Sequence, residues 1–264
     1  MFFYISDIHV EQKINFDALP DVIPEEDFGK IIASIADIVF ASVMEHEEED
    51  YLLIAGDTCE STHVGKFFFG RLAKIWKPDH IIVILGNHEL WTADREWTDT
   101  EGKLENNLDA IIEAWRALFD DLGIVFLQNG TYEISEENTV VLGGLGFTGR
   151  SKDFNACNGQ YLNVLRTQPQ DLAQSMIFDR LYEKTAKRCE SENKKLVVVT
   201  HTPCSSWHDG EIEDEPVSVP VTYISGHTHR NTSWKIENDA GKKQFLADAQ
   251  VGYHGQVFYH LGIV

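Results

Sequence analysis

The sequence predicts an α/β protein in which a mixed sheet, or two stacked sheets, is flanked by helices. Short apolar runs that suit buried strands alternate along the chain with longer segments of helical periodicity. The 264 residues are 43% hydrophobic and 25% charged, a composition typical of a globular protein. Because neither a repeat nor a linker rich in Pro, Gly and Ser divides the sequence, we expect a single domain over residues 1–264.

The first half of the chain predicts alternating strands and helices. In chain order, we expect a strand over 2–5, a helix over 24–44, a strand over 51–55, a helix over 64–76, a strand over 80–85 and a helix over 103–122. The strands are short runs of aliphatic and aromatic residues, as in strands that are buried on both faces. The first helix has Pro24 at its start, acidic residues in its first turn and apolar residues from Phe28 to Val43 at helical spacing.

The second half predicts one hairpin, one long helix and several strands. We expect hairpin strands over 133–134 and 139–142, a helix over 169–192, strands over 196–199 and 221–224, and short strands near Gly241 and Gly255. The polar residues 135–138 between the hairpin strands are typical of a turn. Residues 91–102, 146–165 and 203–219 are expected to be long loops, which in compact domains are often functional.

The charge balance of the chain disfavours a general role in binding nucleic acids. With 22 Lys and Arg against 43 Asp and Glu, the formal net charge is −21. A surface of this charge repels polyanions, so binding through phosphate contacts would need a locally basic groove. We therefore expect a small substrate rather than a nucleic acid, with a nuclease as the alternative if such a groove surrounds the site.

Neither membrane insertion nor export is expected. No apolar run approaches the roughly 18 residues of a membrane-spanning helix, and the first residues lack the basic and long apolar stretches of a secretory signal. The four cysteines, Cys59, Cys157, Cys189 and Cys204, are widely spaced and form no C-x-x-C motif. Because this pattern indicates neither a disulfide framework nor a zinc clip, we expect a soluble protein of the reducing cytoplasm.

Candidate metal ligands directly follow five of the expected strands. They occur in Asp7-Ile8-His9, Gly56-Asp57, Gly86-Asn87-His88-Glu89, His201 and Gly226-His227-Thr228-His229. Ligands in open α/β sheets bind beyond the carboxyl ends of the strands, so we expect these side chains in one crevice. A chain of this composition would contain only about 0.03 G-H-x-H and about 0.04 G-N-H motifs by chance, so the set is specific.

The spacing within the motifs also carries a prediction. Side chains two residues apart on an extended backbone share a face, so the first and last residues of 7–9, and likewise of 227–229, should each point into one pocket. The neighbours Asn87 and His88 should diverge. One of these two can then bind a metal while the other faces the substrate.

The chemistry of these residues favours a pair of divalent cations. Carboxylate, amide and imidazole ligands without thiolates suit Mn²⁺ first, with Fe, Zn²⁺, Ni²⁺, Co²⁺ or Mg²⁺ as alternatives. Seven ligands exceed the needs of a single tetrahedral ion, and only Asp7 and Asp57 oppose the positive charge. A pair of ions about 3.5–4 Å apart lowers the pKa of a bridging water and stabilises an in-line displacement at phosphorus. The sequence therefore predicts phosphoester hydrolysis.

Taken in this order, D-x-H, G-D, G-N-H-E, a single His and G-H-x-H resemble the motifs of the calcineurin-like metallophosphoesterase superfamily, over nearly the whole chain from Asp7 to His229. The resemblance implies a four-layer α/β (α+β) sandwich of two mixed β-sheets flanked by α-helices, with a dinuclear centre. It implies one ion bound by Asp7, His9, Asp57 and His229, and a second bound by Asp57, Asn87, His201 and His227. It also implies that His88 contacts the phosphate and protonates the leaving oxygen, while a hydroxide that bridges the ions attacks phosphorus.

Departures from the family pattern bear on the substrate. Family members often have an acid three residues after the bridging Asp, and here that residue is Glu60, which either orients His88 or is a solvated loop residue. Residues 56–61 lack the Asp-Arg-Gly ending of the Ser/Thr protein phosphatases, whereas the paired histidines resemble the phosphodiesterase and nuclease branches. We expect a phosphodiester or nucleotide-like substrate, with a phosphomonoesterase or protein phosphatase as the alternative.

A rival class is a binding scaffold, since some relatives of this fold have lost catalysis and serve as interaction modules. Such relatives generally lack metal ligands. In this sequence none of the seven ligands is missing and His88 is present. We therefore favour an enzyme.

Overall fold

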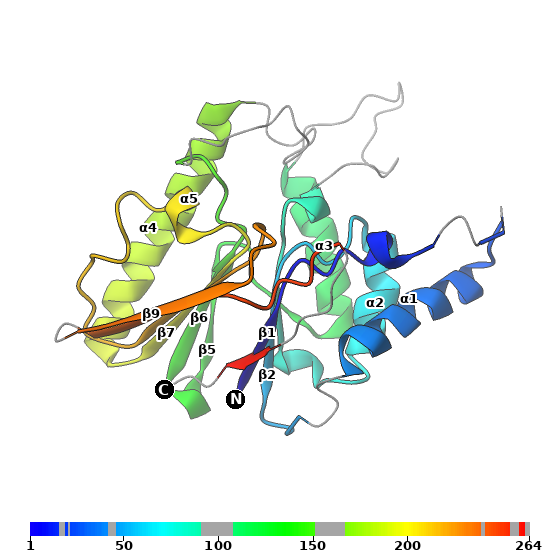
Figure 1. Cartoon of the computed structure of the whole chain (residues 1–264), viewed down its shortest axis with the longest axis horizontal. Coiled ribbons are helices and arrows are strands. Elements are labelled where there is room, and N and C mark those ends of the chain that lie inside the picture. The colour runs from blue at the N-terminus through cyan, green and yellow to red at the C-terminus, as the bar shows by residue number, and fades with distance from the viewer. Residues whose placement is uncertain are drawn as a thin grey trace.

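The structure is a computed structural model that describes residues 1–15, 19–20, 22–41, 46–90, 108–150, 167–238, 241–253 and 259–261. Within these residues the chain forms two β-sheets that pack face to face between layers of helices (Figure 1). This architecture confirms the predicted α/β class and the four-layer sandwich of two mixed sheets. The single domain over residues 1–264 stays a prediction.

The first sheet has five strands among the described residues and is parallel except at one edge. Its spatial order is β11 (Tyr259–Leu261), β1 (Phe2–Ile5), β2 (Tyr51–Ala55), β3 (Ile81–Ile84) and β4 (Val125–Phe126). Strands β1 to β4 run parallel to one another, and β11 pairs with β1 in the antiparallel direction. The carboxyl ends of β1, β2 and β3 therefore lie at the same end of this sheet.

The second sheet has six strands in the part of the chain that the structure describes. Its spatial order is β5 (Gly130–Ile134), β6 (Thr139–Gly144), β7 (Lys195–Thr200), β8 (Val221–Ser225), β10 (Gly241–Ala247) and β9 (Thr232–Asn238). The four central strands are parallel, and β5 and β9 are antiparallel to their neighbours. Because β7 and β8 are parallel neighbours, the residues that follow them leave the sheet at the same end.

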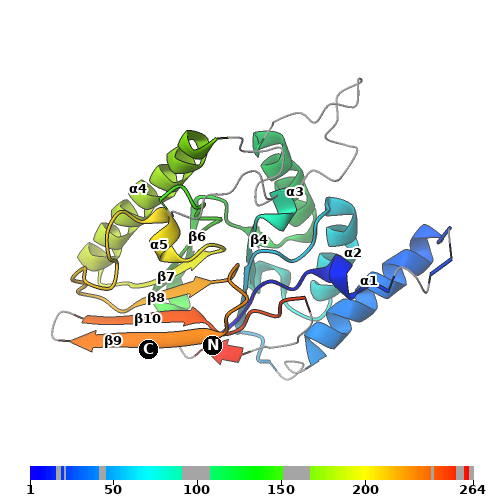
Figure 2. The ribbon, with the colours of Figure 1, turned by 45° about the horizontal axis from the view of Figure 1, so that its top comes forward.

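Helices cover the outer faces of both sheets (Figure 2). The first sheet is covered by α1 (Glu25–Val39), α2 (Thr62–Leu72) and α3 (Leu108–Leu122), and the second by α4 (Gln168–Glu192) and the short α5 (Cys204–Trp207). Short 3₁₀ helices occur at Val10–Lys13, Pro78–His80, His88–Leu90 and Ser135–Glu137. None of the described helices combines the length and the apolar character needed to cross a lipid bilayer.

Three apolar layers hold the sandwich together. Phe68 and Trp115 are buried between the first sheet and its helices. Leu53 and Val197 lie between the two sheets, and Phe178 lies between the second sheet and α4. Each buried side chain of this size stabilises the fold by about 1.5–3 kcal/mol. The layers therefore fix the strand ends relative to one another.

Most of the predicted elements are present, with shifted ends. The helix predicted over 24–44 ends at Val39. The helix predicted over 64–76 begins at Thr62, because the Ser61 side chain caps it by accepting a hydrogen bond from Val64 N. The two-residue strand β4 is absent from the prediction, since so short an element shows no periodicity.

The three predicted loops have different outcomes. The loop predicted over 203–219 is not entirely irregular, because it begins with α5. Of the other two predicted loops, residues 91–102 and 151–165 lie outside the described residues. So do residues 103–107, which begin the third predicted helix, and Gly255 of the last predicted strand.

Candidate metal centre

The loops that carry the predicted ligands meet at one end of the two sheets. Asp7 N donates to Gly56 O at 3.0 Å, which joins the loop after β1 to the loop after β2. Gly226 N donates to His201 O at 2.9 Å, which joins the loops after β8 and β7. His227 N donates to the Asp7 carboxylate, with distances of 3.0 and 3.1 Å to its two oxygens. The last contact links the two sheets, so the structure brings the predicted ligands into one place.

The first group of side chains consists of Asp7, His9 and His229. His9 Nε2 lies 3.0 Å from His229 Nε2. Asp7 Oδ1 lies 3.2 Å from His229 Nε2 and 4.0 Å from His9 Nε2. Asp7 and His9 are buried, whereas the His229 side chain is 28% exposed. One carboxylate oxygen and two imidazole nitrogens thus converge.

The second group consists of Asp57, Asn87, His201 and His227. Asn87 Oδ1 lies 3.0 Å from His201 Nε2 and 2.9 Å from His227 Nδ1, and these two nitrogens are 3.3 Å apart. Asp57 Oδ2 lies 3.2 Å from His201 Nε2. His201 Nδ1 donates to Ala55 O at 2.9 Å, so Nε2 is the nitrogen that faces the group.

Asp57 lies between the two groups. Its Oδ2 is 3.2 Å from His201 Nε2 in the second group and 4.0 Å from His9 Nε2 in the first. Its Oδ1 accepts a hydrogen bond from His88 N at 2.9 Å, which orients the carboxylate. Burial acts to raise the pKa of Asp57, but the charge and hydrogen bond of His201 hold it well below its ordinary value. An ionised carboxylate is therefore common to both groups.

The separations between these atoms fit metal ions. Nitrogen and oxygen ligands about 2.1 Å from one ion lie roughly 3.0–3.4 Å apart in octahedral or tetrahedral geometry. The closest ligand atoms within the two groups are 2.9 to 3.3 Å apart. Imidazole and oxygen donors without a thiolate suit first-row divalent cations. The residues present thus fit the metals that their sequence pattern predicts.

The imidazoles differ in their protonation. Burial lowers the pKa of His9 and of His227 from 6.5 to about 4. Burial acts in the same direction on His201, but the neighbouring charge of Asp57 outweighs it and raises the pKa of His201 to about 9. Metals bind neutral imidazole. His9 and His227 are therefore in the binding form at neutral pH, whereas His201 must release a proton when a metal binds.

His88, the predicted catalytic residue, borders both groups. Its Nε2 lies 3.8 Å from Asp57 Oδ2, and its ring centroid lies 4.5 Å from that of His9. Its Nδ1 donates to Glu60 Oε1 at 3.2 Å, so of the two alternatives for Glu60 the structure favours the one in which it orients His88. Burial acts to lower the pKa of His88, but the Glu60 hydrogen bond and the charge of Asp57 outweigh burial and raise it.

The backbone of the site departs from the sequence prediction. Left-handed conformations, with φ between 48° and 71°, occur at five of the predicted ligands: Asp7, His9, Asp57, His227 and His229. The expectation that 7–9 and 227–229 are extended is therefore wrong. Of the two histidines of 227–229, His227 lies in the second group and His229 in the first. Left-handed backbone costs a non-glycine residue about 1–2 kcal/mol and clusters at functional sites.

Glu89 is part of the centre, although sequence reasoning gave it no role. Its buried carboxylate accepts hydrogen bonds from four backbone N–H groups, those of Gly86 at 2.7 Å, Asp57 at 3.0 Å, Thr58 at 2.6 Å and Cys59 at 3.2 Å. These bonds join the loops after β2 and β3. Burial, together with the charge of Asp57, raises the pKa of Glu89 to about 7. The sequence signal that could have indicated a buried carboxylate here is the acidic residue at the end of G-N-H-E, which apolar residues follow.

Gln250 is a second residue that sequence reasoning missed. Its Oε1 accepts a hydrogen bond from His229 N at 2.6 Å. Its Nε2 donates to Arg230 O at 3.1 Å and to Ala247 O at 2.8 Å. The side chain thus holds the loop of the last two predicted ligands. It lies 21 residues beyond His229 and belongs to no motif, so the sequence carries no signal for it.

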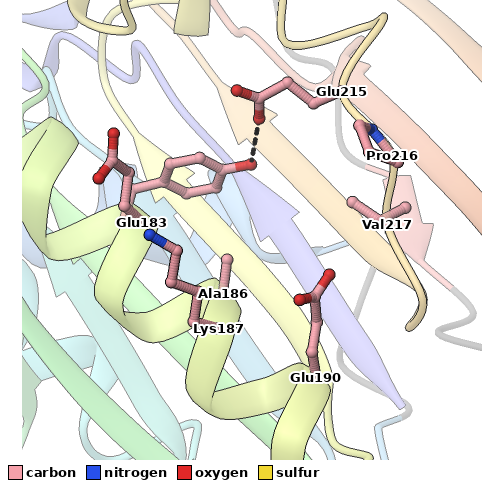
Figure 3. A pocket seen from close by; sticks show the side chains of 8 residues that line it. Glu183, Ala186, Lys187, Glu190, Glu215, Pro216 and Val217 are labelled. Carbon is pink, nitrogen blue, oxygen red and sulfur yellow. Dashed lines mark hydrogen bonds between the residues drawn. The ribbon is translucent and has the colours of Figure 1, made fainter.

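Another cluster of titratable side chains lies beside α4 and includes none of the predicted site residues. A pocket of 290 Å³ is lined there by Tyr182, Glu183, Ala186, Lys187, Glu190, Glu215, Pro216 and Val217 (Figure 3). Tyr182 Oη donates to Glu215 at 3.4 Å. The buried His208 contacts Asp179 through Nδ1 at 2.7 Å and Glu215 through Nε2 at 3.0 Å. These contacts fasten the segment between β7 and β8 to α4.

A four-layer α/β sandwich with Asp, Asn and His side chains gathered at the ends of its parallel strands defines the chain as a metal-dependent hydrolase. A family model described as calcineurin-like phosphoesterase matches residues 2–231. The chain belongs to this family, which confirms the resemblance seen in the motifs.

The chain is also similar to two solved structures. The phosphopantetheinyl hydrolase PptH of Mycobacterium tuberculosis is 18% identical, with a TM-score of 0.52, and the match covers 98% of this chain and 95% of that one. The sulfate thiohydrolase SoxB of Thermus thermophilus is 13% identical, with a TM-score of 0.46 and coverage of 95% and 52%. At these identities the likeness concerns the fold alone. No curated protein matches the sequence.

Proposed function

We propose that this chain is a dinuclear metal-dependent phosphoesterase that hydrolyses a phosphodiester or nucleotide-like substrate. The observation that carries the proposal is the position of the Asp57 carboxylate, 3.2 Å from His201 Nε2 in one ligand group and 4.0 Å from His9 Nε2 in the other. One ion would be bound by Asp7, His9, Asp57 and His229, and the other by Asp57, Asn87, His201 and His227. Mn²⁺ is proposed first, with Fe, Zn²⁺, Ni²⁺, Co²⁺ or Mg²⁺ as alternatives.

The proposed catalytic residue is His88. When bound, two divalent cations supply a water of lowered pKa and positive charge for the phosphoryl oxygens. Glu60 holds Nδ1 of His88, so Nε2 is the nitrogen turned toward Asp57 and the ligand groups. The Glu60 hydrogen bond and the charge of Asp57 outweigh burial and raise the pKa of His88, which favours the protonated ring more than in a free imidazole. As the P–O bond to the leaving group breaks, the Nε2 proton passes to the leaving oxygen, and the water oxygen forms the new P–O bond.

A diester is the preferred substrate class because of the residues that accompany the ligands. Residues 56–61 contain no Arg that could neutralise the second charge of a phosphomonoester, and the G-H-x-H motif resembles the phosphodiesterase branch. The net charge of −21 favours a small substrate over a nucleic acid, and the similar structure named phosphopantetheinyl hydrolase supports a small phosphorylated compound. A phosphomonoesterase or protein phosphatase is the alternative. A cytoplasmic location is proposed from the cysteine pattern.

The proposal is tested by combining metal analysis with hydrolysis assays. We expect two metal ions per chain and faster hydrolysis of bis-p-nitrophenyl phosphate than of p-nitrophenyl phosphate in the Mn²⁺-loaded protein. Removal of the metal with a chelator should abolish both activities. Asp57→Asn and His88→Ala should each lower kcat by several orders of magnitude, the first by removing the shared ligand.

Asp79→Asn is the matched control, since this exposed carboxylate contacts only Lys77 among the ion pairs of the described residues. It should leave kcat unchanged. Hydrolysis that survives chelation, or that survives in Asp57→Asn, would contradict the proposal. Less than one bound ion per chain, without rescue by added Mn²⁺, would instead favour the non-catalytic interaction scaffold.

A further inference from the structure

The candidate centre is covered unevenly by the described residues. The side chains of Asp7, His9 and His201 are at most 1% exposed. The His229 side chain is 28% exposed, and His227 is half-buried. In the part of the chain that the structure describes, the centre is therefore most accessible beside the 227–229 loop.

Tyr253 lies at this accessible side. Its ring centroid is 4.6 Å from that of His9, 4.8 Å from that of His229 and 6.4 Å from that of His88. The residue is nevertheless 43% exposed. The ring thus packs on two proposed ligands and lies near the proposed catalytic histidine, while the residue stays partly open to solvent.

The backbone at Tyr253 is fixed to the loop that carries Asp7. Gly252 N donates to Asp7 O at 2.8 Å, and Gly252 O accepts a hydrogen bond from Lys13 Nζ at 3.2 Å. The preceding residue, Val251, donates its N–H to Ser6 O at 2.9 Å. The aromatic ring is therefore presented to the centre by a segment whose two preceding residues are anchored.

We propose that Tyr253 is a substrate-contact residue, whose exposed ring packs against the organic group of the phosphoester and selects aromatic groups over small alkyl groups. The inference rests on the proposed function. The ligand groups are polar and account for recognition of the phosphate, whereas recognition of an organic group needs apolar surface. A tyrosine ring supplies a large, rigid apolar surface at a small cost in side-chain entropy.

The test measures binding rather than turnover. Phenylphosphonate and methylphosphonate share a phosphonate head and differ only in the organic group. Calorimetric titration of both compounds into the Mn²⁺-loaded protein, and of Mn²⁺ into the metal-free protein, should be done for wild type and Tyr253→Ala. We expect Tyr253→Ala to weaken phenylphosphonate binding about three- to tenfold and to change the affinities for methylphosphonate and Mn²⁺ by less than about twofold.

Two control variants complete the design. Tyr253→Phe keeps the ring and should retain the preference for phenylphosphonate. Trp234→Ala removes an aromatic side chain of similar exposure, 46%, that stacks on Phe245 outside the centre, and it should change neither affinity.

The other results would overturn the inference. An equal loss for both phosphonates, or weaker Mn²⁺ binding in Tyr253→Ala, would mean that Tyr253 acts only by packing on His9 and His229. An unchanged phenylphosphonate affinity would mean that the ring does not contact the organic group. If the wild-type protein binds neither Mn²⁺ nor any of the alternative cations, the proposed function itself fails, and the inference fails with it.

Discussion

Replacing Glu89 by Gln should destabilise the protein, because four backbone N–H groups share its carboxylate. Oε1 accepts hydrogen bonds from Thr58 and Cys59, and Oε2 accepts them from Gly86 and Asp57. A glutamine turns one of these oxygens into a donor, so at least two of the four bonds are lost. Above its pKa of about 7 the Glu89 carboxylate is ionised. At about pH 9, and at about 1.5–3 kcal/mol for each hydrogen bond to a charged group, the free energy of unfolding should therefore fall by about 3–6 kcal/mol.

Urea denaturation followed by circular dichroism measures this change directly. In a chain of this length each kcal/mol lowers Tm by about 2–4 °C, so Tm should fall by at least about 6 °C. The affinity for Mn²⁺ should fall as well, since Asp57 loses one of the contacts that position its loop. Glu136→Gln, at an exposed residue in the hairpin turn, is the matched control and should change neither quantity. A loss of less than about 1 kcal/mol in Glu89→Gln would refute the reasoning.

Three further perturbations test other contacts. Glu60→Gln should lower kcat about 10- to 100-fold and move the alkaline limb of the kcat profile to lower pH, because Glu60 raises the pKa of His88; an unchanged profile would leave Glu60 without this role. Gln250→Leu should weaken Mn²⁺ binding about tenfold in calorimetric titration, because His229 N loses its acceptor, and an unaltered affinity would contradict this. Burial lowers the pKa of His208, but its hydrogen bond to Asp179 and the charges of Asp179 and Glu215 raise it above the ordinary 6.5. The stability from this protonated histidine is therefore complete below pH 6.5 and is lost as the pH rises through the folded-state pKa. His208→Gln should accordingly cost more unfolding free energy at pH 6 than at pH 9, and an equal cost at both would argue against the charged contact.

The sequence predicts the layers of this fold well because their causes are local. The strands β2 and β7 are apolar runs that are buried throughout or nearly so, and the apolar stripe of α1 faces the first sheet. Helix ends are less well predicted, since a side chain such as Ser61 can move a boundary by two residues. The positions of the ligand motifs at strand ends are predicted for the same reason, because each motif directly follows an apolar run.

The finer structure of the site depends on contacts between distant segments. The hairpin of β9 and β10 returns the chain beside β8, and the residues after β10 then run along the end of β1. Ser6 N donates to Ala249 O at 3.1 Å, and this pairing delivers Gln250 and Tyr253 to the centre. Neither residue follows a periodic pattern or belongs to a motif, so only the folded chain reveals them.

The left-handed backbone of the site has a common physical basis. The five left-handed ligands each donate their backbone N–H to another loop of the centre: Asp7 to Gly56 O, His9 to Asp57 O, Asp57 to Glu89, His227 to Asp7 and His229 to Gln250. Each such bond contributes about 1 kcal/mol, close to the roughly 1–2 kcal/mol that a left-handed residue costs. The hydrogen bonds thus offset the cost of the left-handed backbone only while all of these loops contact one another. The proposed ligands are therefore positioned cooperatively, because the displacement of any one loop removes hydrogen bonds that stabilise the left-handed residues of the neighbouring loops.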